Sequence, residues 1–132
     1  MQEILTINVK VTGIYEVKGK SGEAVIINFG GDCNSEFFKG IVLPGGVDTQ
    51  KEFYPGDRMI SARYILEGKD SEGKNCRIFI ENNVELGKDK KLDFTYPRII
   101  TDSECLSWME RAELRGTIEP KERDCIIHIF RQ

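Results

Sequence analysis

Alanine, histidine and long apolar runs are all scarce in this chain, and each shortage excludes a class of protein. Alanine occurs only at Ala24, Ala62 and Ala112, which disfavours a helical bundle because alanine favours the helix more than any other residue. His128 is the single histidine, and the four cysteines form no C-x-x-C pair, so the usual zinc ligand sets are missing. No glycine-rich phosphate loop opens a helix. We therefore expect no bound metal and no cofactor.

The charge and hydropathy of the chain argue against two kinds of partner. A net charge of -3 and a pI of about 5.3 disfavour nucleic acid, whose phosphates require clustered lysine and arginine. The densest basic cluster, residues 88–91, contains Asp89 and is expected in a solvated loop from Glu85 to Lys91. No apolar run approaches the length of a membrane span, and no signal peptide is visible at the start. We expect a cytoplasmic protein with four free thiols and neither a nucleic-acid nor a membrane partner, and we leave a homo-oligomer open.

Short apolar segments separated by turn residues run through the whole chain. In residues 4–11 apolar and polar side chains alternate, which is the period of a half-buried strand. Capping side chains before Cys105 favour one short helix from Ser103 to Met109. In 132 residues this pattern predicts a single domain, 1–132, built as an antiparallel barrel or sandwich of about eight to ten strands. Further strands are expected at residues 24–29, 37–43, 51–53, 58–66, 76–82, 94–100, 111–119 and 125–130, with a break at Gly30-Gly31-Asp32.

The clearest predicted hairpin joins residues 58–66 to residues 76–82. Centred on Ser71, this hairpin places Tyr64 opposite Ile78. Because side chains alternate along a strand, Arg63 then lies on the polar face, diagonal to Glu81. The opposite, apolar face is expected to be the interior, and it comprises Ile60, Ala62, Tyr64, Leu66, Cys76, Ile78 and Ile80.

The most informative segment is a corner of proline and glycine that precedes a carboxylate. Pro44 presets φ for the second position of a turn, and Gly45 can take the positive φ that a type II turn needs next. Gly46 allows a second bend and leaves open space beside Asp48. A carboxylate there could act as a general base or bind a donor of a ligand if partial burial raised its pKa. The alternative is that Asp48 hydrogen-bonds the backbone of its own turn.

This corner resembles the Pro-Gly-Gly-Ala-Asp-Trp-Gln signature of uncharacterised protein family 0311, also called domain of unknown function 3237. Val47 stands here in place of the signature's Ala, and Thr49 in place of its Trp. The resemblance implies a calycin-like or lipocalin-like antiparallel β-barrel with a central cavity, and it implies no settled activity. Further motifs that resemble the family are Ala62-Arg63-Tyr64, residues 96–101 and Trp108-Met109-Glu110-Arg111.

Several side chains are candidates for the cavity. The family motif suggests that Arg63 points inward, against Asp48 or a ligand carboxylate, whereas the hairpin register suggests an exterior salt bridge with Glu81. Tyr64 either offers its hydroxyl to the cavity or simply fills space, and His128 is expected to be a packed or edge residue. The candidate ligand-binding residues are Gly45, Gly46, Asp48, Arg63, Tyr64, Tyr96 and Trp108, although core packing is favoured for Trp108; Asp48, Arg63 and Tyr64 are the candidates for catalysis.

Three functions are compatible with these residues. The leading hypothesis is a barrel that binds a small apolar or aromatic molecule in its cavity. The second is a cofactor-independent isomerase, hydratase or lyase that uses Asp48 as a base and Arg63 or Tyr64 as its electrophilic partner. The third is a scaffold with a filled core that acts through its surface. A solvent-accessible cavity with Asp48 pointing into it would separate the first two from the third.

Overall fold

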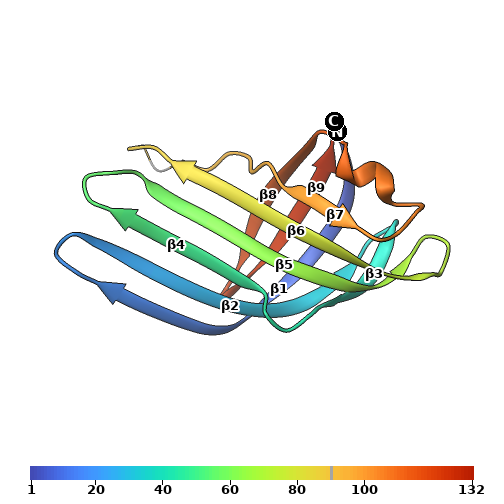
Figure 1. The fold of residues 1–132 in the computed structure, drawn as a ribbon, viewed down its shortest axis with the longest axis horizontal. Helices are drawn as coiled ribbons and strands as arrows, with labels where there is room; N and C mark the ends of the chain where they lie inside the picture. The colour runs from blue at the N-terminus through green and yellow to red at the C-terminus, as the bar shows by residue number, and fades with distance from the viewer. Residues whose placement is uncertain (90) are drawn as a thin grey trace.

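The computed structural model describes residues 1–89 and 91–132, and most of this part of the chain is β-strand (Figure 1). The strands pair antiparallel in one nine-stranded sheet, and one 3-10 helix, η1 (Ser107–Glu110), overlaps the predicted helix. The all-β prediction is therefore confirmed. No helix within the described residues is long and apolar enough to cross a membrane. The strands are β1 (Gln2–Lys18), β2 (Gly22–Asn34), β3 (Phe38–Val42), β4 (Val47–Phe53), β5 (Arg58–Asp70), β6 (Asn75–Leu86), β7 (Arg98–Thr101), β8 (Leu114–Lys121) and β9 (Asp124–Arg131).

Several predicted bounds change, since β4 begins at Val47 rather than at Lys51 and β7 begins at Arg98 rather than at Phe94. The predicted break at Gly30-Gly31-Asp32 is wrong, because β2 runs through it to Asn34. Gly31 instead has a φ of 139° and permits close approach of β1, since a Cβ there would overlap the Asn8 carbonyl oxygen. The predicted loop from Glu85 to Lys91 begins later, because β6 continues to Leu86; Lys90 lies outside the described residues.

The Pro-Gly-Gly corner does not reverse the chain. Strands β3 and β4 both pair with β2 on one side and with β5 on the other. They therefore occupy the same position in the strand order, one after the other along a single lane between β2 and β5. The corner is the bulge between them, anchored where Leu43 N–H donates to Ile65 O at 2.8 Å and Phe29 N–H donates to Gly46 O at 3.0 Å. Gly45 has the predicted positive φ, 107°. The corner therefore interrupts the pairing without changing the alternation of side chains, and Val42 before it and Asp48 after it both point inward.

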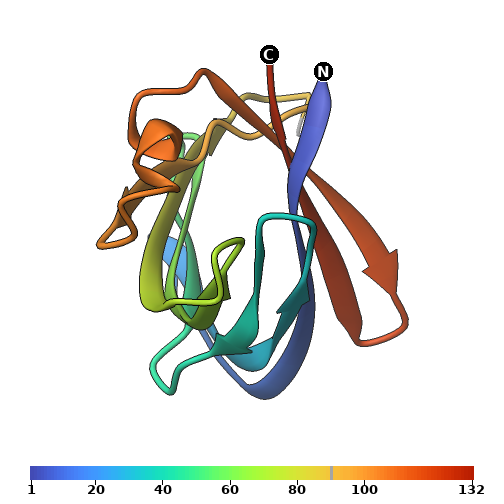
Figure 2. The ribbon, with the colours of Figure 1, turned by 90° about the vertical axis from the view of Figure 1, so that its right-hand side faces the viewer.

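The sheet closes into a barrel through a short seam (Figure 2). The strand order β7-β6-β5-β3-β2-β1-β9-β8 leaves β7 and β8 as its two ends. Between these ends, Thr95 and Gly116 exchange two backbone hydrogen bonds of 2.9 and 2.8 Å. A Cβ at Gly116 would overlap the Thr95 hydroxyl oxygen. The missing side chain at Gly116 therefore allows the seam to close.

One end of the barrel carries η1 and the chain termini (Figure 1), and the buried apolar core includes residues of both regions, among them Ile4, Met109 and Ile129. Met109 of η1 is completely buried, and beside it the Phe37 ring meets the Trp108 ring edge-on at 5.4 Å. The predicted interior face of the β5–β6 hairpin is confirmed by the burial of Leu66, Ile78 and Ile80. The largest fully buried side chains are Ile4, Leu5, Ile7, Cys33, Phe38, Leu66, Ile78, Ile80, Leu106, Met109 and Ile129.

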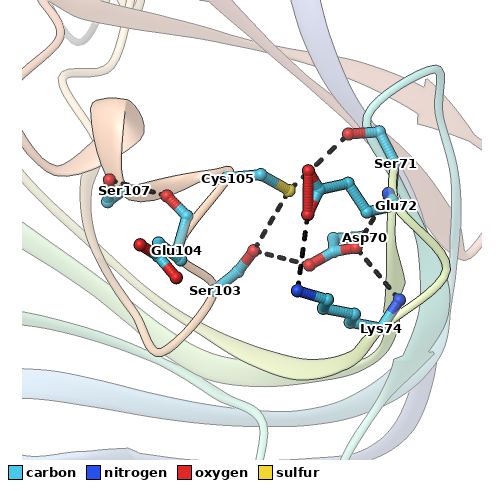
Figure 3. A network of polar contacts seen from close by, with 8 residues as sticks. All are labelled: Asp70, Ser71, Glu72, Lys74, Ser103, Glu104, Cys105 and Ser107. Carbon is cyan, nitrogen blue, oxygen red and sulfur yellow. Dashed lines mark hydrogen bonds and ion pairs between the residues drawn. The ribbon is translucent and has the colours of Figure 1, made fainter.

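A buried carboxylate fixes the turn between β5 and β6 (Figure 3). Asp70 Oδ1 accepts hydrogen bonds from the backbone N–H groups of Glu72 and Lys74 at 2.9 and 3.1 Å. Asp70 Oδ2 accepts from the Ser103 hydroxyl at 2.8 Å, and the Ser103 oxygen lies 3.6 Å from Cys105 Sγ. Hydrogen bonding by Ser103 contributes most to lowering the pKa of Asp70. We interpret this cluster as structural, because it joins the hairpin turn to the segment before η1.

The same turn explains an error in the predicted register. Tyr64 pairs with Ile80 rather than with Ile78, so the hairpin is shifted by two residues from the arrangement centred on Ser71. The hydrogen bonds of Asp70 place the turn around Glu72 instead. A shift of two residues keeps every side chain on its face. The face assignment is therefore right although the pairing is not.

Candidate functional site

A cavity of about 280 Å³ occupies the half of the barrel away from the core. Phe29 and Tyr64 belong both to its lining and to the buried core, so their rings, 5.3 Å apart and edge-on, form the floor between the two. Most of the lining is apolar. It comprises Val9, Val11, Ile27, Phe29, Asp48, Gln50, Ile60, Ala62, Tyr64, Asn82, Val84, Leu92, Thr95, Ile118, Arg123, Asp124, Cys125 and Ile127.

Polar side chains reach this cavity from neighbouring strands in register. Asp48 on β4 pairs with Ala62 on β5, and Ala62 pairs with Asn82 on β6. Paired residues of an antiparallel sheet point to the same face, so Asp48 and Asn82 flank the small side chain of Ala62 on the inner wall. The next inward position of β4 is Gln50, because strand side chains repeat every second residue.

Asp48 is held by a chain of hydrogen bonds that starts at Arg58. Gln50 Nε2 donates to Asp48 Oδ2 at 3.1 Å. Gln50 Oε1 in turn accepts from Nε and Nη2 of Arg58 at 3.3 and 3.2 Å. Arg58 also has Glu52 and Glu23 as ion-pair partners, with its Nη1 3.8 and 4.0 Å from their carboxylate oxygens. The position of the Asp48 carboxyl is thus set by Gln50, which Arg58 at the start of β5 holds in place.

Three buried polar oxygens in the cavity lining have no hydrogen-bond partner among the described residues. They are Asp48 Oδ1, Asn82 Oδ1 and Thr95 Oγ1. A buried polar atom without a partner costs about 1–3 kcal/mol. Burial raises the pKa of Asp48, and the hydrogen bond from Gln50 and the charge of Arg58 offset this only in part. The arrangement suits a ligand or ordered water that supplies the missing hydrogen bonds.

Tyr64 and Cys125 contribute two further titratable groups to the lining. Burial raises the pKa of Tyr64 far above its ordinary value, so the phenol stays neutral. Burial also raises the pKa of the Cys125 thiol, and the nearby charge of Asp48 adds to that effect. All four cysteines are free thiols. A raised pKa makes Cys125 a poor nucleophile, so Asp48 is the best-placed group for proton transfer in this cavity.

Five of the residues predicted for the site lie elsewhere. Arg63 is exposed on the outer face, opposite Val47 and Glu81, because the inward positions of β5 are its neighbours Ala62 and Tyr64. Gly45 is exposed, and Gly46 packs behind the Phe29 ring rather than beside Asp48. The structure therefore brings Asp48 and Tyr64 to the cavity and leaves the other five outside its lining: Gly45, Gly46, Arg63, Tyr96 and Trp108.

Tyr96, Trp108 and His128 have partners outside the cavity. The Arg115 guanidinium lies 4.5 Å from the centre of the exposed Tyr96 ring, and Arg131 lies 4.6 Å from that of Trp108. His128 contacts the carboxylates of Glu3 and Glu119 on the two strands beside β9. Burial lowers the pKa of His128, but these hydrogen bonds outweigh that effect and raise it overall. Within the described residues, no group of three or more His, Cys, Asp or Glu side chains could hold a metal ion.

Sequence reasoning missed Gln50, Arg58, Asn82 and Thr95. A signal was present for Asn82, since it continues the inward parity of Ile78 and Ile80 by one step. Gln50 likewise follows Asp48 by two residues on one strand. No sequence pattern pointed to Thr95, because its inward position depends on the seam with Gly116.

Several solved structures share the fold of this chain. No protein-family model matches the chain, and no curated protein matches it. A protein of unknown function from Clostridium acetobutylicum ATCC 824 is 22% identical, with a TM-score of 0.79 over 99% of this chain and 97% of that one. A beta-barrel like protein from Acinetobacter baumannii AYE is 18% identical (TM-score 0.75, 98% and 93% covered), and an enzyme from Penicillium herquei is 16% identical (0.69, 98% and 92%). At such identities the likeness shows an antiparallel β-barrel fold and nothing of function.

Proposed function

We propose that this barrel binds a small, largely apolar molecule in its inner cavity. The observation that carries the proposal is the cavity of about 280 Å³ itself, with an apolar lining and unpartnered buried oxygens in its walls. An apolar cavity of about 150 Å³ accommodates benzene. The volume here suits a ring compound with substituents, and the few polar groups would orient it.

An enzyme that works in the same cavity is the second candidate. Its support is Asp48, a buried carboxyl with a raised pKa and one oxygen without a partner. Such a group can exchange a proton with a bound molecule. Tyr64 is the available partner for this chemistry, whereas Arg63 lies on the outer face. One structural neighbour is described as an enzyme, which makes the test worthwhile. A surface-acting scaffold with a filled core fits the open cavity less well.

Membership of uncharacterised protein family 0311 is also a proposal. It rests on the corner Pro44-Gly45-Gly46 with Asp48 and on the motifs that follow it in order. A cytoplasmic location is proposed on the four free thiols, which suit a reducing compartment. Neither proposal affects the cavity argument.

Native mass spectrometry of the protein purified from its own cells tests cavity binding. We expect a bound small molecule that is absent from the variant Ala62→Phe, because the added ring fills the space between Asp48 and Asn82. Arg63→Ala, on the outer face of the same strand, is the matched control and should retain the molecule. Retention by Ala62→Phe, or no adduct and no binding of apolar ring compounds to the wild type, would contradict the proposal.

A further inference from the structure

The hydrogen bonds around Asp48 have a defined direction. Arginine carries only donors, so Gln50 must turn its Oε1 toward Arg58, which leaves the Gln50 amide N–H groups for Asp48. Asp48 Oδ2 is therefore an acceptor, at 3.1 Å from Gln50 Nε2. A proton on the carboxyl therefore belongs on the other oxygen, Oδ1, because the carbonyl oxygen of a neutral carboxyl is its stronger acceptor. Oδ1 is the buried atom without a partner.

We propose that Asp48 is a neutral acid with its proton on Oδ1, and that the cavity takes an uncharged ring compound whose carbonyl oxygen accepts this hydrogen bond. The inference rests on the proposed binding function and specifies its ligand class. A carbonyl is the matching group because a neutral carboxyl donates, whereas an ammonium ligand requires an ionised one.

The charge of Arg58 lowers the pKa of Asp48, but its surroundings limit that effect. Arg58 reaches it only through Gln50, and Arg58 has two carboxylates of its own, Glu23 and Glu52, within 4.0 Å. Arg123, which does line the cavity, is an exposed turn residue. Burial has the largest effect, and it raises the pKa of Asp48 and thereby favours the neutral acid. The remaining titratable groups that face the cavity are Asp124, Cys125 and Tyr64, none of which is a cation.

Three probes of nearly equal shape distinguish the possibilities. Acetophenone carries a carbonyl oxygen, α-methylstyrene replaces that oxygen with a methylene group, and 1-phenylethylammonium replaces it with a cationic donor. Affinities are measured by calorimetry at about pH 5, just above the ordinary pKa of an aspartate, and at about pH 9, far above it. We expect acetophenone to bind the wild type about tenfold more tightly than α-methylstyrene at the lower pH. That preference should shrink at the higher pH as Asp48 ionises.

Two variants assign the effect to this carboxyl. Asp48→Leu removes the donor and should abolish the preference for acetophenone at both pH values. Asp48→Asn keeps an N–H donor facing away from Gln50 but cannot ionise, so the pH dependence of the preference should disappear. The ¹³C shift of carbonyl-labelled acetophenone gives an independent reading, since hydrogen bonding moves it downfield in the wild type and not in Asp48→Leu.

The outcomes separate the inference from the function on which it rests. Equal binding of acetophenone and α-methylstyrene would leave the cavity function intact and overturn the proposed donor role of Asp48. Tighter binding of 1-phenylethylammonium would show an ionised Asp48 and would also overturn it. If none of the three probes binds, the proposed cavity function fails, and the inference fails with it.

Discussion

Asp48 makes the stability of the barrel depend on pH in a direction opposite to that of an ordinary ion-paired carboxylate. Its raised pKa means that folding favours the protonated acid. That contribution is fully present below the pKa of the unfolded chain and is lost as pH rises through the higher pKa of the folded state. Asp48→Asn cannot ionise, so its free energy of unfolding should increase relative to wild type across this range. Urea unfolding at several pH values measures the difference.

A surface variant separates this effect from the loss of a negative charge in general. Asp93 is exposed, and Asp93→Asn should show no comparable trend with pH. A constant difference between Asp48→Asn and wild type would mean that Asp48 titrates alike in the folded and unfolded chains.

At the residue scale, sequence reasoning reached Asp48 and Tyr64 and could not complete the site. Asp48 follows a turn whose glycine is recognisable, and Tyr64 lies on a face defined by its apolar neighbours. The family motif could not decide whether the Arg63 side chain points inward or outward. That depends on the alternation of side chains along β5, which the predicted hairpin gave correctly. Arg58 was not predicted, because a chain of hydrogen bonds that runs from it through Gln50 to Asp48 has no sequence signature.

At the scale of elements, the barrel closes through one isolated bridge, which joins β8 to the segment before β7. Gly116→Ala would push a methyl group into the Thr95 hydroxyl, and overpacking of this kind costs about 1–3 kcal/mol. We expect that loss in the free energy of unfolding, measured by urea denaturation. In the double variant Thr95→Ala/Gly116→Ala the obstructing hydroxyl is gone, so the penalty of the glycine substitution should be smaller than in the wild-type background. Equal penalties in the two backgrounds would exclude this clash as the cause.

Element boundaries were predictable where alternation was regular and less so where polar groups act on the backbone. Residues 4–11 and the β5–β6 hairpin were recognisable from period-two patterns. The predicted register of the hairpin was wrong by two residues, because the Asp70 carboxylate accepts hydrogen bonds from two backbone N–H groups of the turn. The predicted break at Gly31 was wrong, because the missing side chain of this glycine allows β1 and β2 to pack closely.

At the scale of the whole molecule, the apolar core and the cavity occupy opposite halves of the barrel. Met109 is fully buried in the core beneath η1, and Met109→Ala should lower the free energy of unfolding by about 2–5 kcal/mol. Because Met109 does not line the cavity, the affinity of the folded variant for a cavity ligand should match wild type. Urea denaturation and calorimetry measure the two quantities. Met59→Ala, at an exposed position of β5, is the control and should change stability by less than about 0.5 kcal/mol.

The fold class was predictable from composition and alternation, because scarce alanine and many short apolar segments leave few options besides an antiparallel barrel or sandwich. Barrel closure was less accessible to sequence reasoning. It depends on β3 and β4 sharing one lane and on two hydrogen bonds at the seam, and both are long-range features.

The pairing of β1 with β9 has a kinetic consequence. Glu3 and His128, which contact each other across this pair, are 125 residues apart in the chain. Proteins dominated by such distant contacts fold slowly, in roughly milliseconds to seconds, because the entropy of closing long loops opposes the early steps. Until β9 docks, the apolar inner wall of the unfinished barrel is exposed to other chains. Refolding from denaturant should therefore lose yield as protein concentration rises, and a molecule that fills the cavity should improve recovery by trapping chains that have already closed.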